Sequence, residues 1–169
     1  MFEREIFARE EFRFSEAALA AGLKPKDFRN WTQRNNIKLP SPSPSDNSWR
    51  KFSIADMCVL GLMRPLVDYG MSVADSNYTA MALVTEDVFD LGQIARIDDF
   101  DISFSRIVAA YVWPNGRDWK CECFTTALHE SPPWPPSIHA ILLRIDMIWQ
   151  DVFNRAGKSL LVSRKNSLK

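Results

Sequence analysis

Basic and amide side chains gather in one segment of this 169-residue chain, between Arg13 and Ser53. That segment has eight Lys or Arg residues and three acidic residues, whereas residues 76–157 have six bases and eleven acids. The whole chain is neutral, with 21 basic and 21 acidic residues, so the two blocks and the remaining residues cancel. A local excess of positive charge attracts polyanions. The early segment is therefore where we expect any nucleic-acid-binding chemistry.

The elements expected around these bases are short helices. Residues 14–22 offer a candidate cap at Ser15, a run of alanine and leucine, and a terminating Gly22. A second helix is expected over residues 26–37, and two helices joined by a tight glycine-containing turn form a helix-turn-helix. The Pro-Ser run at 40–47 predicts an extended loop. A third helix is expected from Ser53 to Gly70, with a kink at Pro65.

Residues 13–76 also contain an ordered set of small, basic and aromatic residues at characteristic separations. In chain order these are Ala18 and Gly22, then Phe28, Arg29 and Trp31, then Arg50, Phe52, Ser53 and Asp56, and finally Gly70, Met71 and Ser72. In order and spacing this segment resembles the MerR-type winged helix-turn-helix. The long Pro-Ser loop, Pro65 and the region that follows differ from the family pattern, so promoter remodelling by twisting is not carried over.

The resemblance implies binding of double-stranded DNA as a homodimer, with the second helix in the major groove and the wing on the adjacent backbone. Lysine and arginine side chains would contact phosphate, whereas Lys26, Asn30 and Gln33 are the candidates for base edges. Trp31 is expected to lie half in the core and half toward phosphate. The candidate DNA-binding residues are Lys24, Lys26, Arg29, Asn30, Trp31, Gln33, Arg50, Lys51 and Phe52.

The second half of the chain continues helical over residues 72–97 and then predicts a β-hairpin. Residues 104–113 and 118–125 flank Asn115-Gly116, a dipeptide that favours a two-residue turn. The register that follows places Ala110 opposite Cys121, Val108 opposite Cys123 and Val112 opposite Trp119. We expect that apolar face to be buried.

A long last helix is expected from about Ser137 to Ala156, after the Pro-rich connector at 131–136. Its apolar residues alternate in spacings of four and three, which predicts a dimerisation seam. The seam residues are Ile138, Leu142, Ile145, Trp149 and Val152. The apolar surface is wider than a seam, so more than one neighbour must cover it, either within the chain or across a dimer.

Other reactive side chains predict little further chemistry. Cys121 and Cys123 could share a metal only with ligands from elsewhere, and the two histidines lie outside usual zinc spacings, so no metal site is expected. No nucleophile motif or phosphate-binding glycine loop is present, so we expect neither a cofactor nor an enzyme. The tryptophans at 113, 119, 134 and 149 could line an effector pocket, although core packing explains them equally well.

Together these patterns predict an α+β fold: a MerR-like winged helix-turn-helix, a helix and β-hairpin module, and a long C-terminal helix. The expected units are residues 13–76 for DNA binding, 77–157 for dimerisation or partner contact, and 158–169 as a basic flexible tail. The expected function is a sequence-specific, homodimeric transcriptional regulator. A small-molecule effector or a protein partner would bind at the C-terminal module.

Two other functions stay open at this stage. One is a phage or mobile-element factor of the excisionase or DNA-packaging type, and the other is a protein-interaction adaptor that keeps the helix-turn-helix as a scaffold. The sequence has no secretory signal and no stretch near the roughly 20 apolar residues of a membrane span. Its three cysteines form no disulfide framework. We therefore expect a cytoplasmic protein with no membrane partner.

Overall fold

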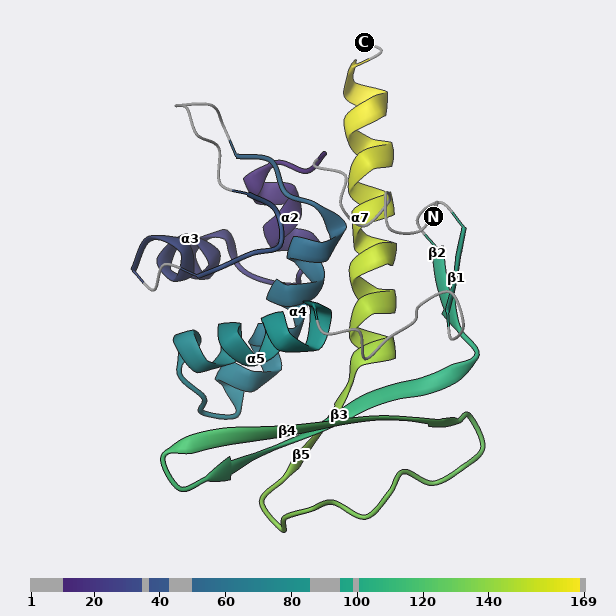
Figure 1. Ribbon diagram of the computed structural model, residues 1–169. Coiled ribbons are helices and arrows are strands. Elements are labelled where there is room, and N and C mark those ends of the chain that lie inside the picture. Colours follow the sequence, from purple (N-terminus) through teal and green to yellow (C-terminus); the bar gives the residue numbers. More distant parts are fainter. Residues whose placement is uncertain (1–10, 35–36, 43–49, 86–94, 99–100, 168–169) are drawn as a thin grey trace.

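The computed structural model describes residues 11–34, 37–42, 50–85, 95–98 and 101–167, and the side chains of α7 as far as Lys158. The chain is α+β, with helices packed on one face of a three-stranded antiparallel sheet (Figure 1). The helices are α2 (Phe14–Ala20), α3 (Pro25–Arg34), α4 (Ile54–Asp68), α5 (Val73–Thr85) and α7 (Ile145–Ser167). The strands are β1 (Ala95–Asp98), β2 (Asp101–Phe104), β3 (Arg106–Asn115), β4 (Asp118–Ala127) and β5 (Ile141–Arg144).

The turn between α2 and α3 is closed by backbone hydrogen bonds around Gly22. Gly22 N–H donates to the Leu19 carbonyl at 3.0 Å, and Leu23 N–H donates to the Ala18 carbonyl at 2.8 Å. This is a Schellman termination, which needs a residue at positive φ, and Gly22 has φ of 70°. The start of α2 differs from the expected Ser15 cap, because the helix begins at Phe14 and Glu16 reaches back to the Arg13 N–H at 2.7 Å.

Helix α4 is the centre of the helical layer. Ten of its fifteen residues are buried, and it continues through Pro65 to Asp68. A Cβ built on Gly61 would lie 3.1 Å from Val152 and 3.3 Å from Ile148, tighter than an ordinary van der Waals contact. The absence of a side chain at Gly61 therefore lets α4 and α7 approach closely.

The hairpin forms, but its register differs from the expected one. Asn115 pairs with Asp118, so the loop residues are Gly116 and Arg117, and Gly116 supplies φ of 68°. The predicted pairs were wrong: Ala110 lies opposite Cys123, Val108 opposite Thr125 and Val112 opposite Cys121. Because the slip is two residues, every side chain keeps its face of the sheet.

The expected long C-terminal helix starting at about Ser137 was wrong. Residues 137–140 are irregular, Ile141–Arg144 form strand β5, and the described side chains of α7 run only from Ile145 to Lys158. Strand β5 pairs antiparallel with β3, from Ala109 opposite Arg144 to Val112 opposite Ile141. A short apolar run fits a buried strand as well as a helix. Here the run becomes a strand because the side of β3 that does not face β4 is open to pair with it.

The five residues of the expected dimerisation seam do not lie on one helix. Ile138 and Leu142 lie outside α7 and are 94% and 41% exposed, whereas Ile145, Trp149 and Val152 are buried within this chain. Helices α2 and α4 and strands β2 and β3 all contact α7. Figure 1 shows α7 rising from the sheet between the other helices and the β1–β2 pair. The wide apolar surface is therefore covered internally.

One continuous core joins the helices to the sheet. It contains Phe28 and Leu60 from the helical layer together with Val108 and Val112 from β3. The expected boundary between residues 76 and 77 falls inside α5, and most of the expected tail at 158–169 lies outside the described side chains. None of the described helices combines the length and apolar character needed to cross a membrane.

The burial of Ile145 generates a stability prediction. Replacing Ile145 with Asp puts an unpaired carboxylate at a fully buried site, so we expect a loss of about 3 to 5 kcal/mol in the free energy of unfolding. The matched variant Met147→Asp places the same group on α7 at a site that is 57% exposed and should lose about 1 kcal/mol. Urea denaturation of both variants measures the difference, and equal losses would contradict the packing of α7.

Candidate nucleic-acid interface

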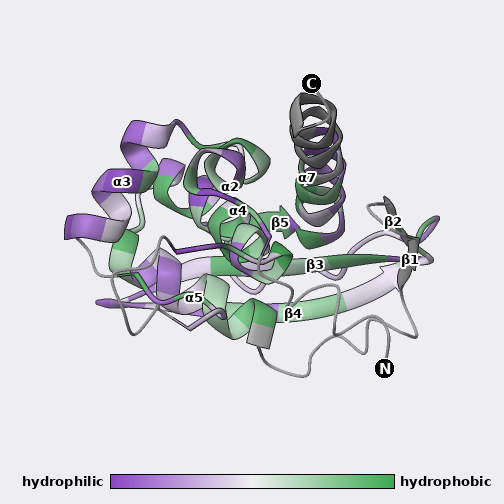
Figure 2. Cartoon of the chain, turned by 90° about the horizontal axis from the view of Figure 1, so that it is seen from above, coloured by the Kyte–Doolittle hydropathy of each residue, from purple (hydrophilic) through white to green (hydrophobic). Residues whose placement is uncertain are grey.

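Helix α3 has one buried face and one polar face. Phe28 and Trp31 are buried against the rest of the helical layer. On the other face Lys26, Arg29 and Gln33 are exposed and Asn30 is half-buried. These four positions follow the i, i+3, i+4, i+7 pattern of a single helix face. Figure 2 shows α3 as a largely hydrophilic helix at the outer edge of the molecule.

A cluster of three phenylalanines lies beneath this region and joins three segments of the chain. Phe14 of α2 stacks on Phe28 of α3, with ring centroids 4.4 Å apart and an interplanar angle of 8°. Phe52 meets both rings edge-on, at 6.2 Å from Phe14 and 5.3 Å from Phe28. Such edge-to-face and stacked pairs stabilise the packing beyond simple area burial.

Two of the expected phosphate-binding arginines rest on this cluster. The Arg29 guanidinium lies 5.9 Å from the Phe14 ring centroid, and that of Arg50 lies 5.3 Å from the Phe52 centroid. Cation–π contact orients a guanidinium without neutralising it. Two arginines 21 positions apart in the sequence are thereby held on one aromatic unit, which connects α3 with the base of the expected wing.

A buried polar network fixes the base of the wing. The Asp56 carboxylate accepts from Ser53 N–H and from Ser41 N–H, both at 2.9 Å, and Ser41 Oγ bonds Ser53 Oγ at 2.9 Å. The Arg50 guanidinium then donates to the Ser41 carbonyl at 3.0 Å. Ser53 and Asp56 belong to the expected capping pair, whereas nothing in the sequence identified Ser41 as their partner.

The segment after α3 is tied to α5 in a similar way. The Asn77 amide accepts from Lys38 N–H at 2.7 Å and donates to the Lys38 carbonyl at 2.8 Å. This leaves the Lys38 side chain exposed close to the end of α3. Lys38 belongs to the basic block but is not among the expected contact residues, because its orientation depends on a partner 39 positions away.

Two members of the expected DNA-binding set are corrected by their burial. Phe52 is 2% exposed and Trp31 is 9% exposed, so both serve the core, and Trp31 is not the half-exposed contact that was expected. Phe52 also pairs its backbone with Phe12. Lys24 and Lys51 are exposed, as a phosphate contact requires. The expected Pro-Ser wing loop lies outside the described residues from position 43 to 49.

The other candidate sites do not assemble. Cys121 is exposed and Cys123 half-buried on edge strand β4, and no cluster of three His, Cys, Asp or Glu side chains occurs in the described part of the chain. Of the four tryptophans, Trp149 is buried and Trp134 is 95% exposed, and none of them lines either of the two cavities at the α2–α3 turn.

Comparisons with known proteins add no family to this picture. No protein-family model matches the chain, and no curated protein matches it.

The cysteines offer a check on the packing. Burial raises the pKa of the Cys58 thiol well above its usual range, and the neighbouring Asp56 carboxylate raises it further. Since the thiolate is the reactive form, Cys58 should resist an aromatic disulfide reagent at pH 8 until the protein unfolds, while Cys121 reacts rapidly. A timed thiol titration of the wild type and of Cys121→Ser tests this, and fast labelling that persists after that substitution and maps to Cys58 would contradict the buried position.

Proposed function

We propose that this protein binds duplex DNA through α3 and acts as a transcriptional regulator. The observation that carries the proposal is the placement of Arg29 and Arg50 on one aromatic cluster, beside the polar face of α3. An α-helix fits the major groove of B-DNA, and cations flanking such a helix contact the phosphates on either side. The likeness of residues 13–76 to the MerR-type family supports the same function.

The residues divide into two roles in this proposal. Arg29, Arg50 and Lys51 contact phosphates, with Lys24 at the start of α3, where the helix dipole also favours anions. Lys26, Asn30 and Gln33 face the base edges, because their amide and ammonium groups can read donors and acceptors in the major groove. Lys38 is added to the phosphate set on the basis of its exposed position after α3.

We further propose that two copies associate, since paired reading heads give a helix-turn-helix protein its affinity for a two-part site. The buried part of α7 is not available for this contact. Large apolar side chains are instead exposed on β5 and the segment before it, namely Trp134, Ile138 and Leu142. In this proposal the protein acts in the cytoplasm.

The phosphate contacts are tested by charge removal. Arg29→Ala and Arg50→Ala should each weaken binding to all duplex sequences and reduce the slope of log K against log salt by about one unit. The control is Arg106→Ala, an exposed arginine at the start of β3, at the end of the sheet next to β1 and β2. Fluorescence anisotropy over a salt series provides the measurement.

The outcomes of that experiment separate the candidate functions. A wild-type protein without salt-dependent duplex binding would refute the DNA-binding proposal and leave the adaptor hypothesis. Equal weakening by Arg106→Ala would show that binding is governed by overall charge and not by the α3 surface.

Base reading is tested at Gln33. Gln33→Ala removes an amide from an exposed position of α3 without changing charge, so we expect altered sequence preference with an unchanged salt slope. Selection of bound sequences from a random duplex library compares the variant with the wild type, and discrimination at one or two positions should fall by about 1 to 3 kcal/mol. Identical preferences would exclude Gln33 as a base contact.

A further inference from the structure

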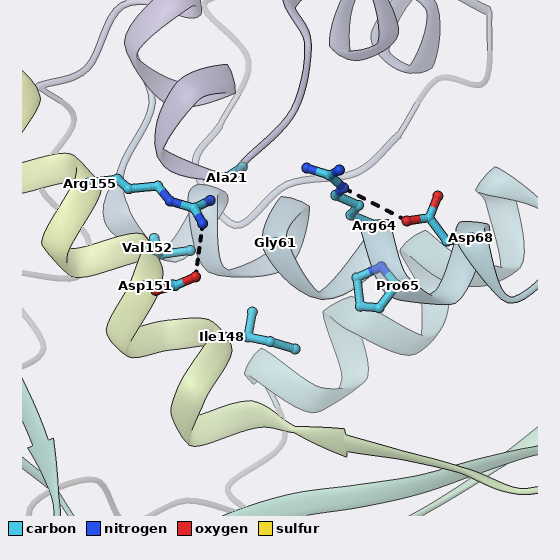
Figure 3. A pocket seen from close by; sticks show the side chains of 9 residues that line it. All are labelled: Ala21, Gly61, Arg64, Pro65, Asp68, Ile148, Asp151, Val152 and Arg155. Atoms are coloured by element: carbon cyan, nitrogen blue, oxygen red, sulfur yellow. Dashed lines mark hydrogen bonds and ion pairs between the residues drawn. The ribbon is translucent and has the colours of Figure 1, made fainter.

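A groove runs where the α2–α3 turn meets α4 and α7. It consists of two adjoining cavities of about 280 and 710 Å³, which share Arg64, Asp68 and Arg155 in their walls. The larger volume lies within the range of small-molecule sites. Figure 3 shows the smaller cavity, with Arg155 reaching from α7 and Arg64 from α4 toward the turn at Ala21.

Two guanidinium groups converge in this groove. The Nη1 atoms of Arg155 and Arg64 lie 2.5 and 3.3 Å from the position that a Cβ on Gly22 would occupy. Arg64 also donates a hydrogen bond to the Gly22 carbonyl. An anion placed between the two guanidinium groups could accept hydrogen bonds from both of them.

The acidic side chains nearby occupy only part of the arginine donors. Asp151 pairs with Arg155 at 2.8 Å and Asp68 lies 3.8 Å from Arg64, and all four side chains are substantially exposed to solvent. A guanidinium has five N–H donors, so each arginine keeps donors for a second acceptor. Over the two cavities together the cations Lys24, Arg64 and Arg155 are balanced by the acids Asp27, Asp68 and Asp151, so the case for an anion rests on these remaining donors and not on a net positive charge.

The remaining wall of the groove is apolar. Leu19, Leu23, Trp31 and Val67 line the larger cavity, and Leu19 is 63% exposed although it is a large apolar side chain. A surface that combines convergent arginines with exposed leucine and a tryptophan edge fits a ligand that has a charged head and an apolar body.

We propose that this groove binds a small organic anion, with a phosphate or carboxylate group between Arg64 and Arg155 and an apolar body against Leu19 and Val67. Binding there does not depend on DNA. The nearest simple probe is phenyl phosphate, compared with benzoate and with inorganic phosphate. Phenyl phosphate and benzoate differ in their charged head, which is a phosphate in one and a carboxylate in the other. Inorganic phosphate has the charged head but no apolar body.

Thermal unfolding of the full chain tests the site. Saturating phenyl phosphate or benzoate should raise the wild-type midpoint by about 3 °C or more, and inorganic phosphate should raise it less. Arg155→Gln should abolish the shift, whereas Arg117→Gln, an exposed arginine on the hairpin turn, should retain it. The proposal is overturned if no organic anion shifts the wild type, or if Arg155→Gln shifts as much as the wild type.

A second variant covers the case in which Arg155→Gln is itself unstable. Leu19→Ser removes an exposed apolar contact, so it should reduce the shift from phenyl phosphate while leaving the smaller shift from inorganic phosphate unchanged. Equal shifts from phenyl phosphate in this variant and the wild type would refute the apolar half of the site.

The position of the groove also gives the ligand a regulatory effect, which rests on the proposed function. Lys24 lines the larger cavity and is also one of the proposed phosphate contacts, so we expect a bound anion to draw its ammonium group toward the groove and away from DNA phosphate. We expect phenyl phosphate to weaken duplex binding about fivefold in the wild type and not in Arg155→Gln. Unchanged affinity in a protein whose midpoint still shifts refutes this regulation, whereas absence of all duplex binding refutes the proposed function and leaves the melting test of the groove intact.

Discussion

The buried carboxylate of Asp56 is the interaction on which the N-terminal half of the molecule depends. A charge in a fully buried position is costly unless hydrogen bonds compensate it, and here two backbone N–H groups do so. One of those donors belongs to Ser53 at the start of α4, and the other belongs to Ser41 in the segment that follows α3. The same carboxylate therefore caps the first turn of α4 and holds the segment around Ser41 against that helix.

The neighbouring residues extend this constraint to the candidate DNA surface. Phe52 immediately precedes the Ser53 cap, and its ring lies against Phe14 and Phe28. Arg50 is anchored on the Ser41 carbonyl and on the Phe52 ring. The Phe14, Phe28 and Phe52 cluster thus fixes both the orientation of α3 and the position of Arg50. Movement of α3 or of Arg50 would expose part of these rings to solvent.

A second constraint links this unit to the rest of the chain. Gly61 allows α4 to lie directly on Val152 and Ile148 of α7, and α7 in turn continues from strand β5 of the sheet. Tyr69 at the end of α4 contacts Trp119 of β4, with ring centroids 5.8 Å apart, and donates to the His139 carbonyl. The groove with Arg64 and Arg155 lies at this junction, so its occupant would touch the α2–α3 turn and both long helices.

Local signals in the sequence determined the parts of the molecule that local interactions control. The glycine at position 22 predicted the turn after α2, Ser53 with Asp56 predicted the start of α4, and the basic block predicted the exposed charge on α3. Asn115-Gly116 predicted the hairpin but placed its turn one residue early, because Gly116 can serve at either loop position and the partner strand fixes the choice.

Contacts between distant residues decided the remainder, because periodicity does not report which surfaces meet. Residues 141–144 form a strand because they pair with β3, and α7 begins at Ile145, directly after the last residue of that pairing. Phe52 is a core residue because an aromatic cluster forms between three segments, and Arg29 and Arg50 meet there for the same reason. Trp31 is buried with Phe28 on the inner face of α3. Arg64 and Arg155 both approach Gly22 although they are 91 positions apart in the sequence, and only the packing of α4 against α7 brings them together.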